Sequence, residues 1–269
     1  MAQRPPRSGA RGPTPSHRRG GLAGALLLGW ALAPAPALAV QQPVDLELVL
    51  AVDASSSVSA DEFHLQIKGL AEAFRNPGVL EAVQAGGDLG IAVSLMQWSD
   101  NRKQVRAVNW TAVYDESTVL ALADAIEATP RYLIGGGTAI GGAIQFAVRQ
   151  FDDNGFDGRR RVIDISGDGR TNQGSQPSDQ RDLAVALGIT INGLAILNED
   201  PTIDTYYFRN VIGGTGAFVV TANDYESYAV AILTKLIREI AAVPIAAVPR
   251  PFAPSQAQAG TRVQTWARP

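Results

Sequence analysis

Small hydroxyl and carboxylate side chains recur in three short segments of this sequence, each placed where an apolar run ends or a helix is expected to begin. Together the segments supply five candidate metal ligands: Asp53, Ser55, Ser57, Thr138 and Asp168. Hard divalent cations prefer oxygen ligands, and two carboxylates balance the charge of such a cation. Asp, Ser and Thr are also common in turns and at helix N-caps, so one segment alone would not indicate a site.

The composition restricts any metal site to oxygen ligands. The chain has no Cys, which excludes disulfides, zinc–thiolate sites and iron–sulfur clusters. Its two His residues are His17 and His64, and His17 lies in a predicted leader, so a multi-histidine site is excluded too. We therefore predict Mg²⁺ as the ion, with Mn²⁺ or Ca²⁺ as alternatives.

The first 39 residues are typical of an export signal that is cleaved after Ala39. Arg18 and Arg19 precede an apolar run, residues 21–33, and Ala37-Leu38-Ala39 is a small-x-small cleavage sequence. This run is shorter than the ~20 residues that a membrane-spanning helix needs. We therefore predict a periplasmic or extracellular protein with no membrane span after cleavage, exported by the Sec or the twin-arginine route.

The chain after the leader divides into a predicted α/β domain, residues 40–243, and a tail rich in Pro, Ala and Gln, residues 244–269. The tail shows little periodicity, and we expect it to be mobile. After residue 39 the chain carries 18 basic and 26 acidic residues. This acidic balance lacks the electrostatic footprint of a protein that binds nucleic acid or an anionic membrane.

Strands and helices are predicted to alternate along the domain. The predicted strands are residues 44–53, 90–98, 104–109, 161–166, 190–197 and 217–221. The predicted helices begin at the N-caps Ser59 and Ser117 and otherwise cover residues 139–151, 178–187, 205–212 and 225–241. This alternation predicts a Rossmann-like, doubly wound, mainly parallel six-stranded sheet with helices on both faces. A short polar turn joins the second and third strands as a hairpin, so strand three is expected to be antiparallel.

A strand order of 3-2-1-4-5-6 would bring the candidate ligands together. Strands one and four would then be neighbours where the winding reverses, which is where ligands bind in open α/β sheets. The helix after the hairpin returns the chain to the same edge and leaves Thr138 there. An incomplete ligand shell would leave room for a carboxylate from another molecule. Asp164, inside the fourth predicted strand, is expected to need a polar partner if it is buried.

At these residues the sequence resembles the von Willebrand factor type A domain family. Asp53-x-Ser55-x-Ser57, Thr138 and Asp168-Gly169 match, in order, the three parts of that family's metal-ion-dependent adhesion site. Residues 160–169, 188–194 and 211–214 look like the exported bacterial subfamily named as domain of unknown function 1194, and the resemblance extends over about residues 45–241. It implies a Rossmann-like sheet and divalent-cation-dependent binding of a protein partner. The chain departs from the family at Gly167, where a Thr commonly supplies a hydroxyl.

Other functions remain open on the sequence. A metal-dependent hydrolase could use Asp53 and Asp168, but none of the three segments contains a His or Lys that could act as general base. A serine hydrolase would need His64 and a Gly-x-Ser-x-Gly elbow, which is absent. A degenerate module would bind no metal. We favour a non-enzymatic, exported, metal-dependent adhesion module that binds an Asp or Glu of a protein partner; its oligomeric state is left open.

Overall fold

The computed structural model describes residues 41–241 and 265–267. The predicted export signal and most of the predicted tail lie outside these residues. No helix in the described ranges has both the length and the apolar character that a membrane span requires.

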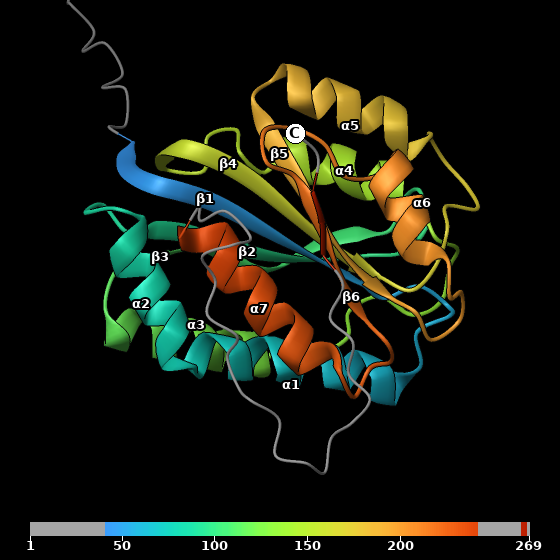
Figure 1. Ribbon diagram of the computed structural model, residues 1–269, viewed down its shortest axis with the longest axis horizontal. Helices are drawn as coiled ribbons and strands as arrows, with labels where there is room; N and C mark the ends of the chain where they lie inside the picture. The colour runs from blue at the N-terminus through green and yellow to red at the C-terminus, as the bar shows by residue number, and fades with distance from the viewer. Residues whose placement is uncertain (1–40, 242–264, 268–269) are drawn as a thin grey trace, which may run out of the picture. The chain divides into compact units, whose positions relative to one another are not determined.

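A mixed β-sheet forms the centre of the domain, in the order β3-β2-β1-β4-β5-β6-β7 (Figure 1). The neighbours from β2 to β6 pair in parallel, whereas β3 and β7 pair antiparallel to the strands beside them. The order of the first six strands and the antiparallel β3 confirm the predicted topology. The strands are β1 (Gln42–Asp53), β2 (Ile91–Trp98), β3 (Gln104–Val113), β4 (Phe156–Gly167), β5 (Ile189–Ile196), β6 (Phe218–Ala222) and β7 (Thr265–Ala267).

The seventh strand was not expected. β7 comes from the segment that the sequence assigned to the tail, and it pairs with the edge strand β6, with Ala267 opposite Phe218. Three residues are too few to show the alternating pattern that identifies a strand, so this pairing depends on a distant part of the chain.

Helices cover both faces of the sheet (Figure 1). On one face lie α1 (Ala60–Arg75), α2 (Pro77–Gly86), α3 (Glu116–Glu127) and α7 (Tyr228–Ala241); on the other lie α4 (Ile140–Arg149), α5 (Pro177–Ala186) and α6 (Ile203–Asn210). Each face of the sheet packs against its helices in a separate hydrophobic core. Alternate residues of β1 point into these cores: Leu48 and Leu50 into the first, and Val49 and Ala51 into the second. Burial on both faces explains why β1 is almost continuously apolar.

The helix boundaries in the structure differ from the predicted ones at two places. Asn76-Pro77-Gly78 was expected to end a helix, but Asn76 also begins α2, its Oδ1 accepting a hydrogen bond from Gly78 N at 2.9 Å. Pro77 suits this first turn because its missing N–H would be unpaired there anyway. The N-cap of α3 is Asp115 and not Ser117. The predicted cap of α1 is confirmed: Ser59 and Glu62 form a capping box.

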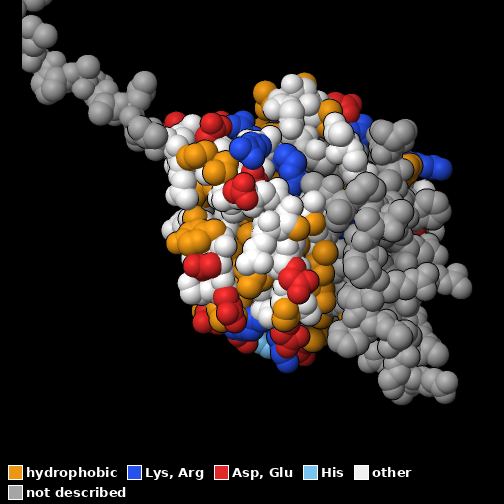
Figure 2. Space-filling view, turned by 60° about the vertical axis from the view of Figure 1, so that its left-hand side comes forward, with side chains coloured by type: hydrophobic (Ala, Val, Ile, Leu, Met, Phe, Trp, Pro, Cys, Tyr) orange, Lys and Arg blue, Asp and Glu red, His pale blue; other side chains and the backbone are white. Residues whose placement is uncertain are grey.

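On the face drawn in Figure 2, acidic and basic side chains are interspersed with hydrophobic ones.

Candidate metal centre

The sheet brings the first and third polar segments into contact. Asp53 is the last residue of β1, and Asp168 directly follows β4, the strand beside it. The Ser57 hydroxyl donates a hydrogen bond to Asp168 Oδ1 at 2.9 Å, joining residues 111 positions apart. Asp53 and Ser55 are fully buried. Both carboxylates therefore lie at the carboxyl edge of the sheet, at the reversal point between β1 and β4.

Short local contacts order the turn after β1. Ser55 N donates to Asp53 Oδ1 at 2.7 Å, and the hydroxyls of Ser55 and Ser57 lie 3.1 Å apart. The hydroxyl between them points elsewhere, because Ser56 Oγ donates to Gly136 O at 2.7 Å. That bond ties the first polar segment to the glycine triplet of the second.

The second segment places Thr138 beside the third. A β-carbon added to Gly169 would lie 3.5 Å from Thr138 Oγ1, so the Thr138 hydroxyl faces the Asp168-Gly169 turn. Thr138 N donates to Asn172 Oδ1 at 2.9 Å, and Thr138 is nearly buried. The N-cap residue of α4 is Ala139, so Thr138 does not serve as that helix's cap.

Two acidic side chains meet in the centre, and the positive charge of Arg131 offsets only a small part of the burial and repulsion that act on Asp53. Asp53 Oδ2 is buried and has no hydrogen-bond partner among the described residues. Burial, followed by the charge of Asp168, raises the pKa of Asp53 to about 8. Burial also raises the pKa of Asp168, although hydrogen bonds from Ser57 and Tyr225 oppose the rise. A divalent cation between these groups would stabilise both charges, so the residues present fit such an ion.

The donor set is poor in carboxylates. Within the described ranges, no three His, Asp or Glu side chains gather as a metal-binding group. The centre instead combines two carboxylates with three hydroxyls, from Ser55, Ser57 and Thr138. Neutral hydroxyl ligands leave a bound cation with enough positive character to attract another carboxylate.

Two tyrosines that the sequence did not single out complete the centre. Tyr225 donates its hydroxyl to Asp168 Oδ2 at 2.9 Å. Tyr207, on α6, is fully buried, and its hydroxyl lacks a partner among the described residues. Burial and the nearby charges of Asp53 and Asp168 raise the pKa of Tyr207 far above its ordinary value, so the hydroxyl keeps its proton.

Two glycines make room for Tyr207. A β-carbon at Gly193 would lie 2.8 Å from the Tyr207 ring, and one at Gly167 would lie 2.8 Å from both the Tyr207 hydroxyl and Asp53 Oδ2. The two unpartnered atoms therefore border the same space above Gly167. The sequence suggested that Gly167 leaves this part of the site without a hydroxyl; in the structure, the absence of a side chain there admits the hydroxyl of Tyr207.

The loop between α3 and α4, residues 128–139, borders the candidate metal centre and is held in place by hydrogen bonds, so we name it the pinned loop. Arg131 Nη2 donates to the carbonyls of Ala54 and Ser55 at 2.9 and 3.0 Å, and Ser99 Oγ donates to Gly135 O at 2.7 Å. Ile134, on the same loop, is nevertheless 83% exposed, which leaves an apolar side chain in solvent close to the polar segments.

Two other polar side chains that the sequence brought into question, Asp200 and His64, take no part in the centre. Asp200 binds Arg170 at 2.7 Å, and hydrogen bonds from Thr202 and Arg170 lower its pKa to about 2. His64 lies on the exposed side of α1.

The chain belongs to the family described as "Protein of unknown function (DUF1194)", whose model matches residues 43–244. None of the curated proteins matches the chain.

Solved structures show the fold. Proximal thread matrix protein 1 from the mussel byssus is similar with a TM-score of 0.54 and 18% identity, over 75% of this chain and 48% of that one. This chain thus spans about half the length of the byssus protein. A von Willebrand factor type A protein from Catenulispora acidiphila matches with a TM-score of 0.49 and 15% identity, over 74% and 42% of the two chains. Manganese-loaded TRAP protein from Plasmodium vivax matches with a TM-score of 0.49 and 12% identity, over 85% and 78%. The chain therefore shares its fold, a doubly wound, Rossmann-like sheet between two layers of helices, with the byssus protein.

Proposed function

We propose that this chain is an exported, divalent-metal-dependent module that binds a protein partner and catalyses no reaction. Asp53, Ser55, Ser57, Thr138 and Asp168 would hold Mg²⁺, or Mn²⁺ or Ca²⁺ in its place, and an Asp or Glu of the partner would complete the ligand shell. The bound ion would supply the positive charge that recognises the partner's carboxylate.

The main support for the proposal is that the carboxyl group of Asp53 is buried and has one oxygen without a partner among the described residues. A fully buried carboxyl group with an unpartnered oxygen and a second carboxylate nearby is costly to ionise unless a cation compensates its charge. The hydroxyls of Ser55 and Ser57 lie next to it, and the loop that carries Thr138 is tied to the same turn. The ligand types and their convergence both support a hard cation.

The exposed side chains of the pinned loop indicate what kind of residue a partner would place beside its Asp or Glu. Ile134 and Tyr132 are exposed on the pinned loop, and Lys103 Nζ donates to Ile134 O at 3.4 Å. Because the loop is already held by hydrogen bonds, binding there would cost little ordering entropy. An apolar residue next to the partner's Asp or Glu would bury Ile134 and Tyr132.

The proposal is tested by affinity capture from the exported fraction of the source cells, with immobilised protein in Mg²⁺ or in excess chelator. We expect a specific partner that is retained in Mg²⁺, released by chelator, and not retained by Asp53→Asn. Asp152→Asn is the matched control, since it makes the same change at an exposed carboxylate that is not a proposed ligand. A partner held equally with and without chelator would contradict the proposal, as would metal-dependent hydrolysis of phosphate or carboxylic esters that Asp53→Asn abolishes.

A further inference from the structure

A buried lysine lies under α7, on a part of the molecule that the metal centre does not use. Lys235 is fully buried, and its Nζ lies 2.7 Å from Asp164 Oδ2. Nζ also contacts the carboxylate of Glu239, one helical turn further along α7. Asp164 was expected to need a polar partner, and among the described residues the ion pair with Lys235 is what it has.

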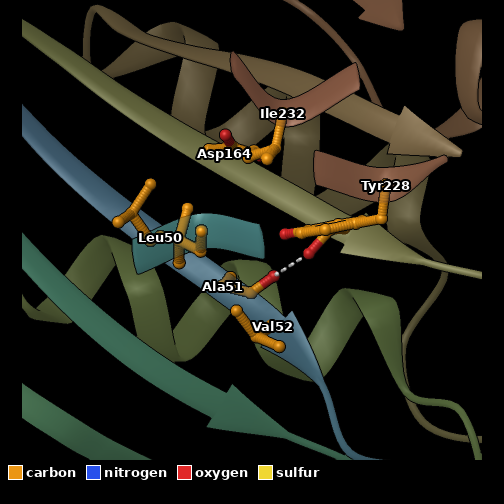
Figure 3. Close-up of a pocket in the computed structure, with 8 residues that line it drawn as sticks. Leu50, Ala51, Val52, Asp164, Tyr228 and Ile232 are labelled. Atoms are coloured by element: carbon orange, nitrogen blue, oxygen red, sulfur yellow. Dashed lines mark hydrogen bonds between the residues drawn. The ribbon is translucent and has the colours of Figure 1, made fainter. Parts of the chain in front are cut away.

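Lys235 and Asp164 lie among apolar side chains, whereas Glu239 also borders a cavity lined by Arg160, Arg161 and Arg238. Asp164 belongs to β4, opposite Leu50 of β1 and Asn192 of β5. Figure 3 shows Asp164 beside Ile232 and Tyr228 of α7, across a narrow pocket also lined by Leu50 and Val52. The Phe218 ring lies 5.7 Å from Lys235 Nζ. Separated charges are costly here, so a reaction that removes charge is favoured.

The two carboxyl groups differ in a way that assigns them different roles. Glu239 Oε1 accepts a hydrogen bond from Asn192 Nδ2 at 2.8 Å, and burial raises the pKa of Glu239 well above its ordinary value. Glu239 is thus an oriented carboxylic acid that can accept a proton on one oxygen and donate one from the other. Asp164 receives no hydrogen bond from another described side chain. Its carboxyl carbon is therefore the less shielded target for an amine.

We propose that Lys235 and Asp164 form an intramolecular amide bond, with Glu239 as the proton carrier. The Lys235 ammonium first gives a proton to the Asp164 carboxylate, which leaves a neutral amine and a neutral acid. Nζ then attacks the carboxyl carbon of Asp164, Glu239 takes a proton from nitrogen and returns one to the leaving hydroxyl, and one water departs. A C–N bond forms, a C–O bond breaks, Glu239 ends unchanged, and no oxidant or cofactor is needed.

Proximity makes the condensation feasible without activation of the carboxyl group. Fixed intramolecular partners reach effective concentrations of about 10⁵ M or more, far above any that free groups attain in solution. Glu239 and Asn192 also line a second cavity, together with Arg238 and Phe218, which gives the released water a route away from the bond. The product would join α7 covalently to the central strand β4.

Intact mass spectrometry of the purified, denatured protein tests the proposal once its N-terminus has been sequenced. The expected mass is lower than the sequence mass by one water. Trypsin should leave Lys235 uncut and yield peptide 162–170 joined to peptide 210–238. A mass equal to the sequence mass would overturn the proposal, and so would a bridge that maps to other residues.

Variants separate the nucleophile from the proton carrier. Lys235→Met should show its full sequence mass, and Glu239→Gln, which retains the size of the side chain, should be unlinked or linked in only a small fraction. Lys68→Met is the matched control, because Lys68 and Glu72 form an i,i+4 pair that is exposed. If Lys235→Met fails to fold, Glu239→Gln still decides: a fully linked Glu239→Gln protein would contradict the role of Glu239.

Discussion

The raised pKa of Asp53 comes from its burial and from the groups beside its two oxygens. Its backbone neighbour Ser55 donates to one oxygen, while the other oxygen borders the unpartnered hydroxyl of Tyr207. No hydrogen bond joins these two atoms in the structure, and we predict that one forms when Asp53 binds a cation, because outer partners commonly fix the direction of metal ligands.

Replacing Tyr207 by Phe should therefore weaken metal binding without removing a ligand. Loss of an outer partner commonly costs about 10–100-fold in metal affinity, and we expect a decrease in that range for Mn²⁺. Titration calorimetry of Tyr207→Phe against wild type measures it. Tyr206→Phe serves as control, because the Tyr206 hydroxyl accepts from Thr171 N instead. Equal Mn²⁺ affinity in Tyr207→Phe and wild type would exclude this role.

Among the residues of the centre, the sequence could indicate the five candidate ligands but not the two tyrosines. The ligands lie in short motifs whose spacing is visible along the chain. Tyr225 lies 57 residues from its partner Asp168, and Tyr207 reaches the centre only because Gly167 and Gly193 lack side chains. An aromatic residue on a predicted helix is ordinarily a core residue, and nothing local distinguishes Tyr207 from one.

At the scale of elements, local chemistry predicted most strands and helices and failed where two signals compete. Asn76-Pro77-Gly78 both ends α1 and starts α2, and it was interpreted only as an end. At α3, both Asp115 and Ser117 have N-cap chemistry, and Ser117 was predicted as the cap that Asp115 provides.

The α3 cap can be checked by two substitutions. Asp115 Oδ1 accepts from Thr118 N at 2.8 Å, so Asp115→Ala should lower the free energy of unfolding by about 1 kcal/mol. Ser117→Ala should change it by less than about 0.5 kcal/mol, because Ser117 is exposed and does not cap the helix. Urea unfolding of both variants measures the difference; a larger loss in Ser117→Ala would reverse the assignment.

Among the described residues, buried charges gather at the metal centre, at the cluster under α7 and at the start of β1, where Asp45 and Glu47 lie. The order of the first six strands was predictable, because alternating strands and helices allow few arrangements. β7 was not predictable, because its three residues show no local pattern and their partners in β6 lie 45 to 49 positions away in the sequence.

Raised pKa values predict how stability depends on pH in the metal-free protein. The pKa of Asp53 is about 8 in the folded state and 3.8 when exposed, so the folded state binds more protons between these values. Stability is then greatest at low pH within this window and falls as pH rises through 8. In chelator, we expect the melting temperature to fall by on the order of 5 °C between pH 5 and pH 8.5.

The variant Asp53→Asn isolates this contribution. Glu239 acts in the same direction if it titrates, so part of the fall should remain in the variant. A melting temperature that rises with pH in wild type, or falls equally in Asp53→Asn, would contradict the assignment to Asp53.

The central claim is that three polar segments bind one divalent cation, and calorimetric titration of Mn²⁺ into chelator-stripped protein tests it most directly. We predict one binding site per chain in wild type and in the control variant Asp152→Asn, and none in Asp53→Asn. The Asp53→Asn variant should fold normally, because the neutral amide resembles the protonated acid that a pKa of about 8 gives Asp53 at neutral pH. Absence of Mn²⁺ binding to the wild type, or unchanged binding to folded Asp53→Asn, would contradict the account.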